Sequence, residues 1–163
     1  MEFADVVKER RSVRAYLDKE VPDDVVYELL EYGRLAPSAG NIQPWVFIVS
    51  RDKEIRDKLV NATFRGIDEN TEPHYWLQQA PILITICSDR DRVYAKYKER
   101  GQAIFQYLDI GATIENISLG AVAHGLGTCW IGSFSPTKTA EILGVPSYLE
   151  PVSILSLGYP DPA

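Results

Sequence analysis

The sequence predicts an α+β fold in which a sheet of several strands is flanked by helices. Short apolar runs at 45–49 and 81–87 have the length and composition of buried strands. They are separated by segments in which apolar residues have helical spacing, the longest covering about 98–124. The 163 residues, 45% hydrophobic and 25% charged, suffice for one core, so we expect residues 1–163 to form a single domain.

Two helices are expected before the first strand. Residues 2–11 have helical spacing of apolar side chains, which places Arg10 and Arg11 in the last turn, where cations suit the helix dipole. A second helix is expected to begin with a proline and an aspartate and to cover about 22–35. Pro37 ends it, because the residue before a proline avoids helical geometry.

The middle of the chain is expected to alternate strands with helices. A helix over about 53–62 follows the strand at 45–49, and residues 50–52 can cap it. The polar segment 65–75 has no convincing period, so we expect a mobile segment near an opening. The strand at 81–87 follows it.

The second half of the chain is expected to contain the long helix and two further strands. Apolar side chains spread over more than one face of 98–124, which indicates a central helix, and Gly125 and Gly127 are expected to end it. The remaining expected elements are a short strand at 128–131, a helix over 135–143 capped by Ser135, a last strand at 151–157 and a tail from Gly158 to Ala163.

Composition argues against several classes of function. A net charge of −6 argues against nucleic acid as the main partner, because that footprint is a basic face. No apolar run approaches the roughly 18 residues that span a bilayer, and the acidic N-terminus is not a secretory signal. Cys87 and Cys129 fit no metal or redox spacing, so we expect buried free thiols, no metal site and a cytoplasmic protein.

Two polar clusters suggest a ligand site. Arg10-Arg11-Ser12-Val13-Arg14 concentrates three guanidinium groups and a hydroxyl, which suit a small anion such as a phosphate carried on a cofactor. The loop Pro37–Trp45 contains Ser38, Asn41 and Gln43, whose donors and acceptors suit the edge of a flat heterocycle. Taken alone, the first cluster is also compatible with an ordinary helix end and the second with a simple connector.

In this order, the two clusters resemble the FMN-dependent nitroreductase family. The resemblance rests on Arg10-Arg11-Ser12-Val13-Arg14-Ala15-Tyr16 and on Ala36-Pro37-Ser38-Ala39-Gly40-Asn41-Ile42-Gln43-Pro44-Trp45, and it continues at 109–112 and 125–134. It implies a nitroreductase-like fold with a central mixed or antiparallel sheet flanked by helices. It also implies a homodimer that holds one FMN at each end of its interface.

The resemblance assigns FMN contacts to two parts of one subunit and to a loop of the other. It implies that Arg10, Arg11 and Ser12 hold phosphate and ribityl oxygens and that Arg14 approaches the N1/O2 side of the ring. It implies that the backbone of Ile131, Gly132 and Ser133 faces N5 and O4. The residues that it assigns to the other subunit are Pro37, Ser38, Ala39 and Asn41. A cation near N1 favours the reduced flavin. Asn61 and Asn70 are both possible counterparts of an amide that contacts the ring in some relatives.

The implied function is an FMN-dependent oxidoreductase that works in two half-reactions. NADH or NADPH would reduce the flavin, which would then reduce a nitroaromatic, a quinone or a similar electron-poor acceptor. The flavin carries the chemistry, so no catalytic side chain and no metal is expected, and Gly132 contributes its backbone near N5. The alternatives are other flavin chemistry on the same fold (flavin fragmentation, dehalogenation or heterocycle oxidation) and a non-catalytic FMN-binding protein.

Other residues receive weaker interpretations. His74, with its two aromatic neighbours, is expected either to line the substrate opening or to form a surface patch. His124, near a helix end, is interpreted as dipole-favoured or packed in the core. Asp109 and Glu115 are out of phase on their helix and form a poor carboxylate pair. Many relatives carry basic residues after the motif at 157–160 and this sequence does not, so we expect either that the arginines hold the phosphate alone or that a natural tail is missing.

Overall fold

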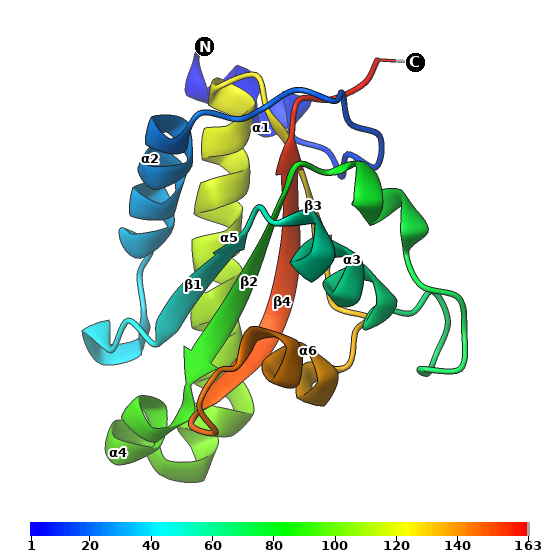
Figure 1. Ribbon diagram of the computed structural model, residues 1–163. Helices are drawn as coiled ribbons and strands as arrows, with labels where there is room; N and C mark the ends of the chain where they lie inside the picture. The colour runs from blue at the N-terminus through cyan, green and yellow to red at the C-terminus, as the bar shows by residue number, and fades with distance from the viewer. Residues whose placement is uncertain (163) are drawn as a thin grey trace.

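A computed structural model confirms the α+β class and describes residues 1–162. Within these residues the sheet has four antiparallel strands in the order β1-β2-β4-β3 (Figure 1). The strands are β1 (Trp45–Ser50), β2 (Ile82–Asp89), β3 (Gly127–Ile131) and β4 (Leu149–Gly158). The expected sheet is therefore found, and its order places β1 and β3 at the two edges. Ala163, the end of the expected tail, lies outside the described residues.

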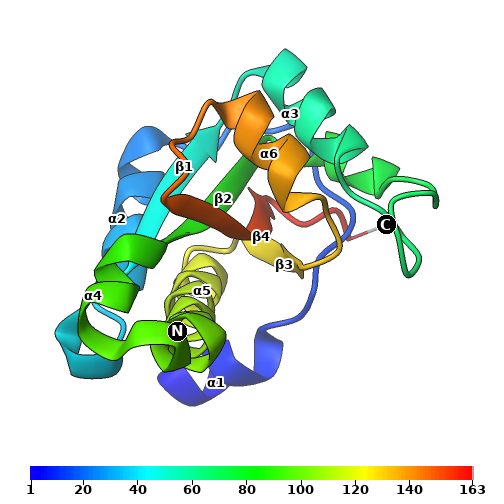
Figure 2. The same ribbon diagram turned by 90° about the horizontal axis from the view of Figure 1, so that it is seen from below.

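Helices cover both faces of the sheet (Figure 2). One face carries α2 (Asp23–Arg34) and α5 (Gln106–Ala123), with α1 (Phe3–Glu9) packed against α5. The other face carries α3 (Lys53–Asn61), α6 (Pro136–Leu143) and the short 3-10 helix η2 (Tyr75–Gln79). Successive side chains of a strand point to opposite faces, so Ile82, Ile84 and Ile86 enter the α2/α5 core while Leu83 enters the α3/α6 core.

Two predicted helix starts are confirmed by their caps. The Asp52 side chain accepts a hydrogen bond from the Ile55 backbone N–H at 3.0 Å, at the start of α3. The Ser135 side chain accepts one from the Lys138 N–H at 3.5 Å, at the start of α6. Each cap satisfies a backbone donor that the first helical turn leaves unpaired.

The prediction of one helix over 98–124 is wrong at its beginning. A separate helix, α4 (Arg90–Arg100), occupies the first residues of that range, and its backbone leaves helical geometry at Lys98, where φ is 51°. One π-helical turn, η3 (Gly101–Phe105), then leads into α5. The buried Gly101 explains the break, because a Cβ there would lie 2.7 Å from Tyr97 Cβ and 2.8 Å from Val93 Cγ1. Glycine thus allows α4 to fold closely onto the chain that follows it.

Two smaller predictions are also corrected. Helix α1 ends at Glu9, so Arg10 is its C-cap and Arg11 lies beyond it, outside the last turn. The helix-end interpretation therefore still applies to Arg10, at the cap, but not to Arg11. Gly125, with φ of 70°, ends α5 as predicted, but Gly127 belongs to β3. A Cβ at Gly127 would lie 2.5 Å from Val13 Cγ2, so this glycine lets the N-terminal segment approach β3.

The other expectations for single residues and segments are met in part. Cys87 and Cys129 are buried free thiols, as predicted. The segment 65–74 contains neither helix nor strand, and the Arg65 N–H donates to the Glu72 carbonyl at 2.8 Å to close it into a loop. Among the described residues, no helix is both long and apolar enough to cross a membrane.

The buried Tyr16 hydroxyl is expected to stabilise the N-terminal segment. It donates to the Val13 carbonyl at 2.8 Å and lies 2.7 Å from Ser156 Oγ of β4, and burial raises the pKa of the phenol, so the proton stays in place. Tyr16→Phe should lower the free energy of unfolding by about 1–2 kcal/mol, because it leaves two buried polar groups with one partner fewer. Urea unfolding measures this loss. Tyr27→Phe on the exposed side of α2 is the control, and an equal effect of both variants would contradict the assignment.

Candidate functional site

The segment 10–14 runs beside β3 at one edge of the sheet. Ser12 forms a parallel bridge with Thr128, and the Val13 N–H donates to the Thr128 carbonyl at 2.9 Å. Because alternate side chains of an extended segment point in opposite directions, Val13 enters the core while Ser12 and Arg14 face outward. The extended backbone thus presents a hydroxyl and a guanidinium on one outer surface.

The three arginines of this segment lie in different surroundings. Arg10 Nε is 3.3 Å from a carboxylate oxygen of Glu115 on α5. Arg11 lines a pocket of about 150 Å³ beside Val13 and residues 125–127. Arg14 lies close enough to Cys129 and His74 for its charge to lower the pKa of each. The three guanidinium groups therefore contact different neighbours.

Ser12 and Arg14 lie next to the Cys129 thiol. Burial raises the pKa of Cys129, while the Arg14 charge and a hydrogen bond with the Ser12 side chain act in the opposite direction. Cys129 is only 3% exposed, so its thiol packs beneath the segment 10–14 and is not accessible to a ligand. The hydrogen bond helps to fix the Ser12 side chain.

The turn 131–133 follows β3 at the same edge of the sheet. Its Ser133 carbonyl accepts from the Phe64 N–H at 3.0 Å, and Ser133 Oγ lies 2.9 Å from His74 Nε2. Gly132 is exposed, and a Cβ built on it would meet no atom within 4 Å. Nothing within the described chain requires a glycine at this position, whereas a flat ligand placed against the turn would.

The second predicted cluster, the loop 37–43, lies at the opposite edge, where it leads into β1. Its 3-10 turn η1 (Ala39–Asn41) has φ of 53° at Gly40 and 56° at Asn41, and Gln43 has φ of 52°. The Ser38 side chain stabilises the loop by accepting from the Gln43 N–H at 2.9 Å. Pro37 and Asn41 are exposed, and Ser38 and Ala39 are half-buried.

Three side chains outside the loop hold its backbone. Asp109 of α5 accepts from the Ala39 N–H at 3.0 Å. From α4, Lys96 donates to the Gly40 carbonyl and Arg92 to the Gln43 carbonyl, each at 2.8 Å. These contacts are strong because each has a charged partner.

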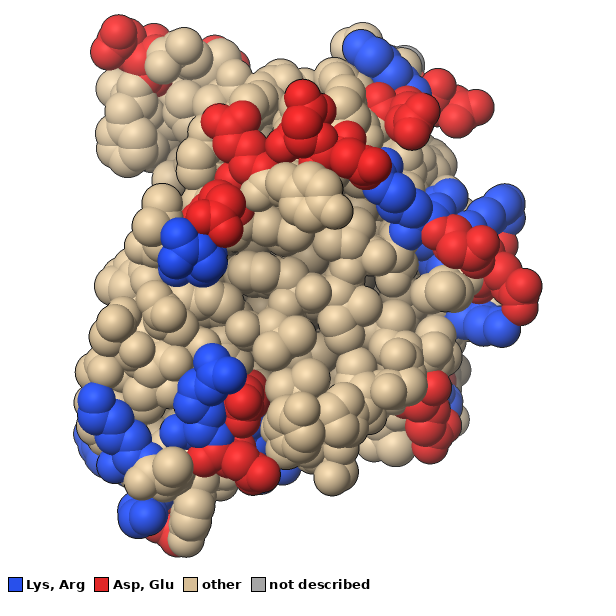
Figure 3. Space-filling model, turned by 60° about the vertical axis from the view of Figure 1, so that its left-hand side comes forward, with Lys and Arg blue, Asp and Glu red and all other residues tan. Residues whose placement is uncertain are grey.

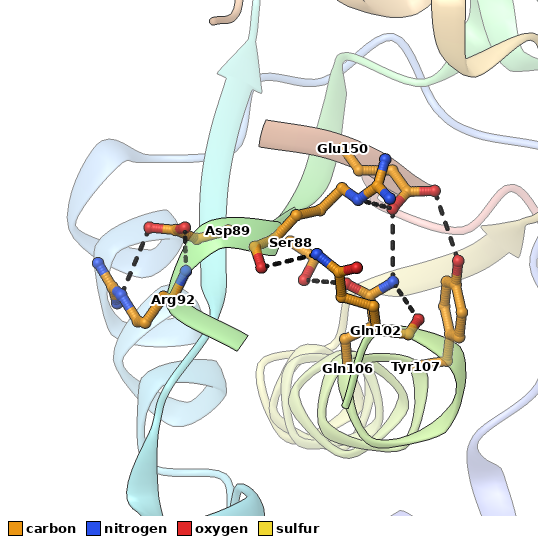
Figure 4. Close-up of polar contacts among 8 residues, drawn as sticks. Ser88, Asp89, Arg92, Gln102, Gln106, Tyr107 and Glu150 are labelled. Atoms are coloured by element: carbon orange, nitrogen blue, oxygen red, sulfur yellow. Dashed lines mark hydrogen bonds and ion pairs between the residues drawn. The ribbon is translucent and has the colours of Figure 1, made fainter. Parts of the chain in front are cut away.

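A polar network fixes α4 against the sheet (Figure 4). Asp89 caps α4 by accepting from the Arg92 N–H at 2.9 Å, and it pairs with the Arg92 side chain at 3.4 Å. Glu150 of β4 forms an ion pair with Arg90 at 3.5 Å and accepts a hydrogen bond from the Gln106 amide at 3.4 Å. Figure 3 shows Lys and Arg side chains, with some Asp and Glu among them, at the lower end of the molecule, and an arc of Asp and Glu side chains near the upper end. The loop 37–43 is thus contacted by two cations, Arg92 and Lys96, and by the carboxylate of Asp109.

The two predicted parts of the site do not meet within one chain. Ser12 and the turn 131–133 adjoin β3, the loop 37–43 adjoins β1, and the sheet order places β4 and β2 between them. With strands about 4.8 Å apart, three spacings separate the parts by about 14 Å. In Figure 1 the N-terminal segment and the loop lie toward opposite ends of the molecule. Within one chain the two parts therefore lie at opposite edges of the sheet.

Sequence reasoning missed the residues that support the site. The sequence indicated Asp109 only as a poor member of a carboxylate pair, whereas in the structure its carboxylate accepts a hydrogen bond from the Ala39 N–H of the loop. Arg92 and Lys96 gave no signal, because their function depends on contacts distant in sequence. Asn61 ends α3 and Asn70 lies in the exposed turn 68–71, so these two remain alternatives. Among residues 1–162, no group of three or more His, Cys, Asp or Glu is placed to hold a metal ion.

The fold and this arrangement identify the class of protein. The Nitroreductase family matches residues 7–159, and the chain belongs to that family. A protein of Archaeoglobus fulgidus described as "Putative NADH dehydrogenase/NAD(P)H nitroreductase" is 36% identical over 93% of this chain and 81% of its own length.

Solved structures agree with the family assignment. A nitroreductase family protein of Clostridium difficile is 30% identical and superposes with a TM-score of 0.83, covering 100% of this chain and 87% of its own. A second structure from that species, described as an "FMN-dependent Nitroreductase", is 29% identical with a TM-score of 0.81, covering 97% of this chain and 87% of its own.

Substitutions at Asp109 should separate its acceptor function from its charge. Burial raises the pKa of this carboxyl, and the hydrogen bond from Ala39 acts in the opposite direction. The folded state thus binds the proton more tightly than the unfolded state, so this group lowers stability as pH rises above 3.8, its ordinary pKa. Asp109→Asn keeps the acceptor without the charge and should equal or exceed the wild type in stability at pH 7.

Asp109→Leu should instead cost about 1 kcal/mol, because the Ala39 N–H loses its partner. Urea unfolding at pH 4 and pH 7 measures both variants, and the advantage of Asp109→Asn should grow with pH. Equal stability of the Asn and Leu variants at both pH values would show that the hydrogen bond contributes nothing.

Proposed function

We propose that this protein is an FMN-dependent oxidoreductase that takes hydride from NADH or NADPH and reduces a nitroaromatic, a quinone or a similar electron-poor acceptor. Family membership and the description of the Clostridium difficile relative support the cofactor. The description of the Archaeoglobus fulgidus relative supports the donor. The observation that carries the proposal is the edge of β3, where outward-facing Ser12 and Arg14 lie at the same edge as the open turn at Gly132.

The residues present fit FMN at this edge. Arg10, Arg11 and Ser12 supply cations and a hydroxyl for the phosphate and ribityl oxygens. Arg14 would place its charge at the N1/O2 side of the ring, and the backbone of the turn 131–133 would face N5 and O4. Bound FMN would supply the hydride chemistry, while the protein positions it and provides fixed charges and dipoles.

The second subunit of a homodimer would complete the site with Pro37, Ser38, Ala39 and Asn41. An exposed apolar stripe on α5 and the preceding η3 supports this assembly. Leu108 of α5 is 65% exposed and Ile104 of η3 is 42% exposed. Phe3 of α1, which packs against α5, is 71% exposed. Apolar side chains in such a stripe are typical of a surface that is covered in an oligomer. A second copy of the chain would cover it and bring the loop 37–43 to the β3 edge.

The same proposal covers the organisation and location of the protein. Residues 1–163 would act as one nitroreductase-like domain, with no nucleic-acid or membrane partner. The two buried free thiols are typical of a reducing compartment, which supports the cytoplasm.

An absorbance spectrum followed by anaerobic titration tests the function. The purified protein should carry FMN or take it up, and NADH or NADPH should bleach its absorbance, which a nitroaromatic or quinone should restore. Reduction only by another donor would indicate other flavin chemistry on this fold. Bound FMN without turnover would indicate a binding protein, and a protein that takes up no FMN would contradict the proposal.

Arg14→Ala should weaken FMN binding and lower the reduction potential of the bound flavin. The lost interaction is a charged hydrogen bond worth about 1.5–3 kcal/mol, so the dissociation constant should rise at least about tenfold. Fluorescence titration and redox titration measure the two effects. Arg34→Ala, at the exposed end of α2, is the matched control. An unchanged reduction potential would exclude a contact between Arg14 and the N1/O2 side of the flavin ring.

Leu108→Glu should separate the subunits, because it places a charge within the apolar stripe. The variant should run as a monomer in size-exclusion chromatography with light scattering, and it should lose FMN while keeping its circular dichroism spectrum. Ile67→Glu adds the same charge at a fully exposed site distant from α5 and should change neither property. A dimeric Leu108→Glu protein would exclude this surface as the interface.

A further inference from the structure

The segment 64–74, called the strap below, is tied to the turn 131–133 by several contacts. The Phe64 N–H donates to the Ser133 carbonyl at 3.0 Å. At the other end of the strap, the His74 N–H donates to Thr63 Oγ1 at 2.9 Å. His74 Nε2 also lies 2.9 Å from Ser133 Oγ. Both ends of the strap thus meet beside Ser133.

The surroundings of the His74 ring determine which nitrogen carries the proton. The Phe64 backbone raises the pKa of the ring. The backbone group responsible is the carbonyl, because an N–H donor would favour the neutral ring and the Phe64 N–H already donates to Ser133. Since Nε2 faces Ser133, the carbonyl is the partner of Nδ1–H. In the neutral ring Nε2 is then the acceptor, and the Ser133 hydroxyl donates to it.

We propose that His74 is a positioning residue that sets the direction of the Ser133 hydroxyl. With His74 neutral, Ser133 donates its only proton to Nε2. With His74 protonated, Nε2–H donates to Ser133, and the hydroxyl proton is free for a ligand acceptor at the turn 131–133. The inference rests on the proposed function, in which the ligand is the edge of FMN that carries N5 and O4.

Burial and two neighbouring cations disfavour protonation of the ring. Burial lowers the pKa of His74, and Arg65 of the strap and Arg14 beside β3 lower it further against the effect of the Phe64 bond. Trp76 of η2 packs edge-on against the ring, 6.1 Å between centroids, and adds no charge. The pKa of the ring therefore lies below 6.5, its ordinary value, and acidic conditions favour the state in which the Ser133 hydroxyl proton is free.

The position of Gly132 makes this direction relevant to a ligand. The turn is open on the side of Gly132, where a Cβ would meet nothing within 4 Å. Ser133 is the next residue and is half-buried, with its hydroxyl held by His74. A ligand seated on the turn would gain one additional donor when His74 is protonated, worth about two- to tenfold in affinity for a neutral hydrogen bond.

The first test uses the protein without FMN. The sequence contains two histidines, so ring nitrogen NMR with His124→Gln as the assignment control resolves His74 directly. The neutral ring should carry its proton on Nδ1, and His74 should titrate below 6.5. A neutral ring with its proton on Nε2 would overturn the inference, because Ser133 would then already be the acceptor.

The second test measures the dissociation constant of FMN at pH 7.5 and pH 5.5 in the wild type, Ser133→Ala and His74→Phe. Between pH 7.5 and pH 5.5, the affinity of the wild type for FMN should increase about two- to tenfold relative to the change measured for Ser133→Ala. That subtraction removes the attraction between protonated His74 and the phosphate. His74→Phe should show no increase, because it has no proton to gain.

Equal pH dependence in the wild type and Ser133→Ala would overturn the inference while leaving the proposed function intact. Absence of FMN binding at both pH values would contradict the proposed function and the ligand part of the inference. The NMR measurement would still decide the direction of the hydrogen bond in that case.

Discussion

The packing of α5 against the sheet supports both parts of the proposed site. Asp109 of α5 holds the loop 37–43 through the Ala39 N–H, and Glu115, six residues further on, pairs with Arg10. At 1.5 Å per residue these two anchors lie about 9 Å apart along one rigid helix. The opposite side of α5 buries Ile110, Ile114 and Ile117 against the sheet and α2. Any shift of this helix would therefore move both parts together.

The sheet order places the two parts of the proposed site at opposite edges of one chain. Ser12 and Arg14 lie beside β3, while the loop 37–43 leads into β1. The buried strands β2 and β4 separate these two edges. The apolar stripe around Leu108 lies on the same helix that anchors both parts. Dimerisation through α5 would thus bury the stripe and bring the segment 10–14 of each chain to the loop 37–43 of the other chain.

Local sequence patterns predicted the elements whose causes are local. Apolar runs identified the strands, and Asp52 and Ser135 marked helix starts, because a cap bonds to a backbone group three residues away. The break between α4 and α5 was missed because Gly101 is required by contacts with Val93 and Tyr97, which a linear pattern of apolar residues does not encode. The segment from Ile104 onward has helical spacing, so the pattern extended the helix too far back.

The site was predictable to a similar extent and for the same reason. The arginines and the loop are consecutive residues that form recognisable motifs, and their placement at two edges agrees with the expectation that the loop serves another subunit. The supports were not visible, because Asp109, Arg92 and Lys96 reach the loop from positions 49 to 70 residues away in the sequence. The contact between His74 and Ser133 spans 59 residues.

A mixed dimer tests most directly whether the site is built from two chains. One chain carries Arg14→Ala, and the other carries Gly40→Val, which distorts the loop because φ is 53° there and a Cβ would lie 2.4 Å from Lys96 Nζ. In a dimer of these two chains, one site contains both defects and the other contains neither. The account predicts one FMN per mixed dimer bound with wild-type affinity, while each homodimer binds weakly. Weak binding at both sites of the mixed dimer would show that a single chain forms the site.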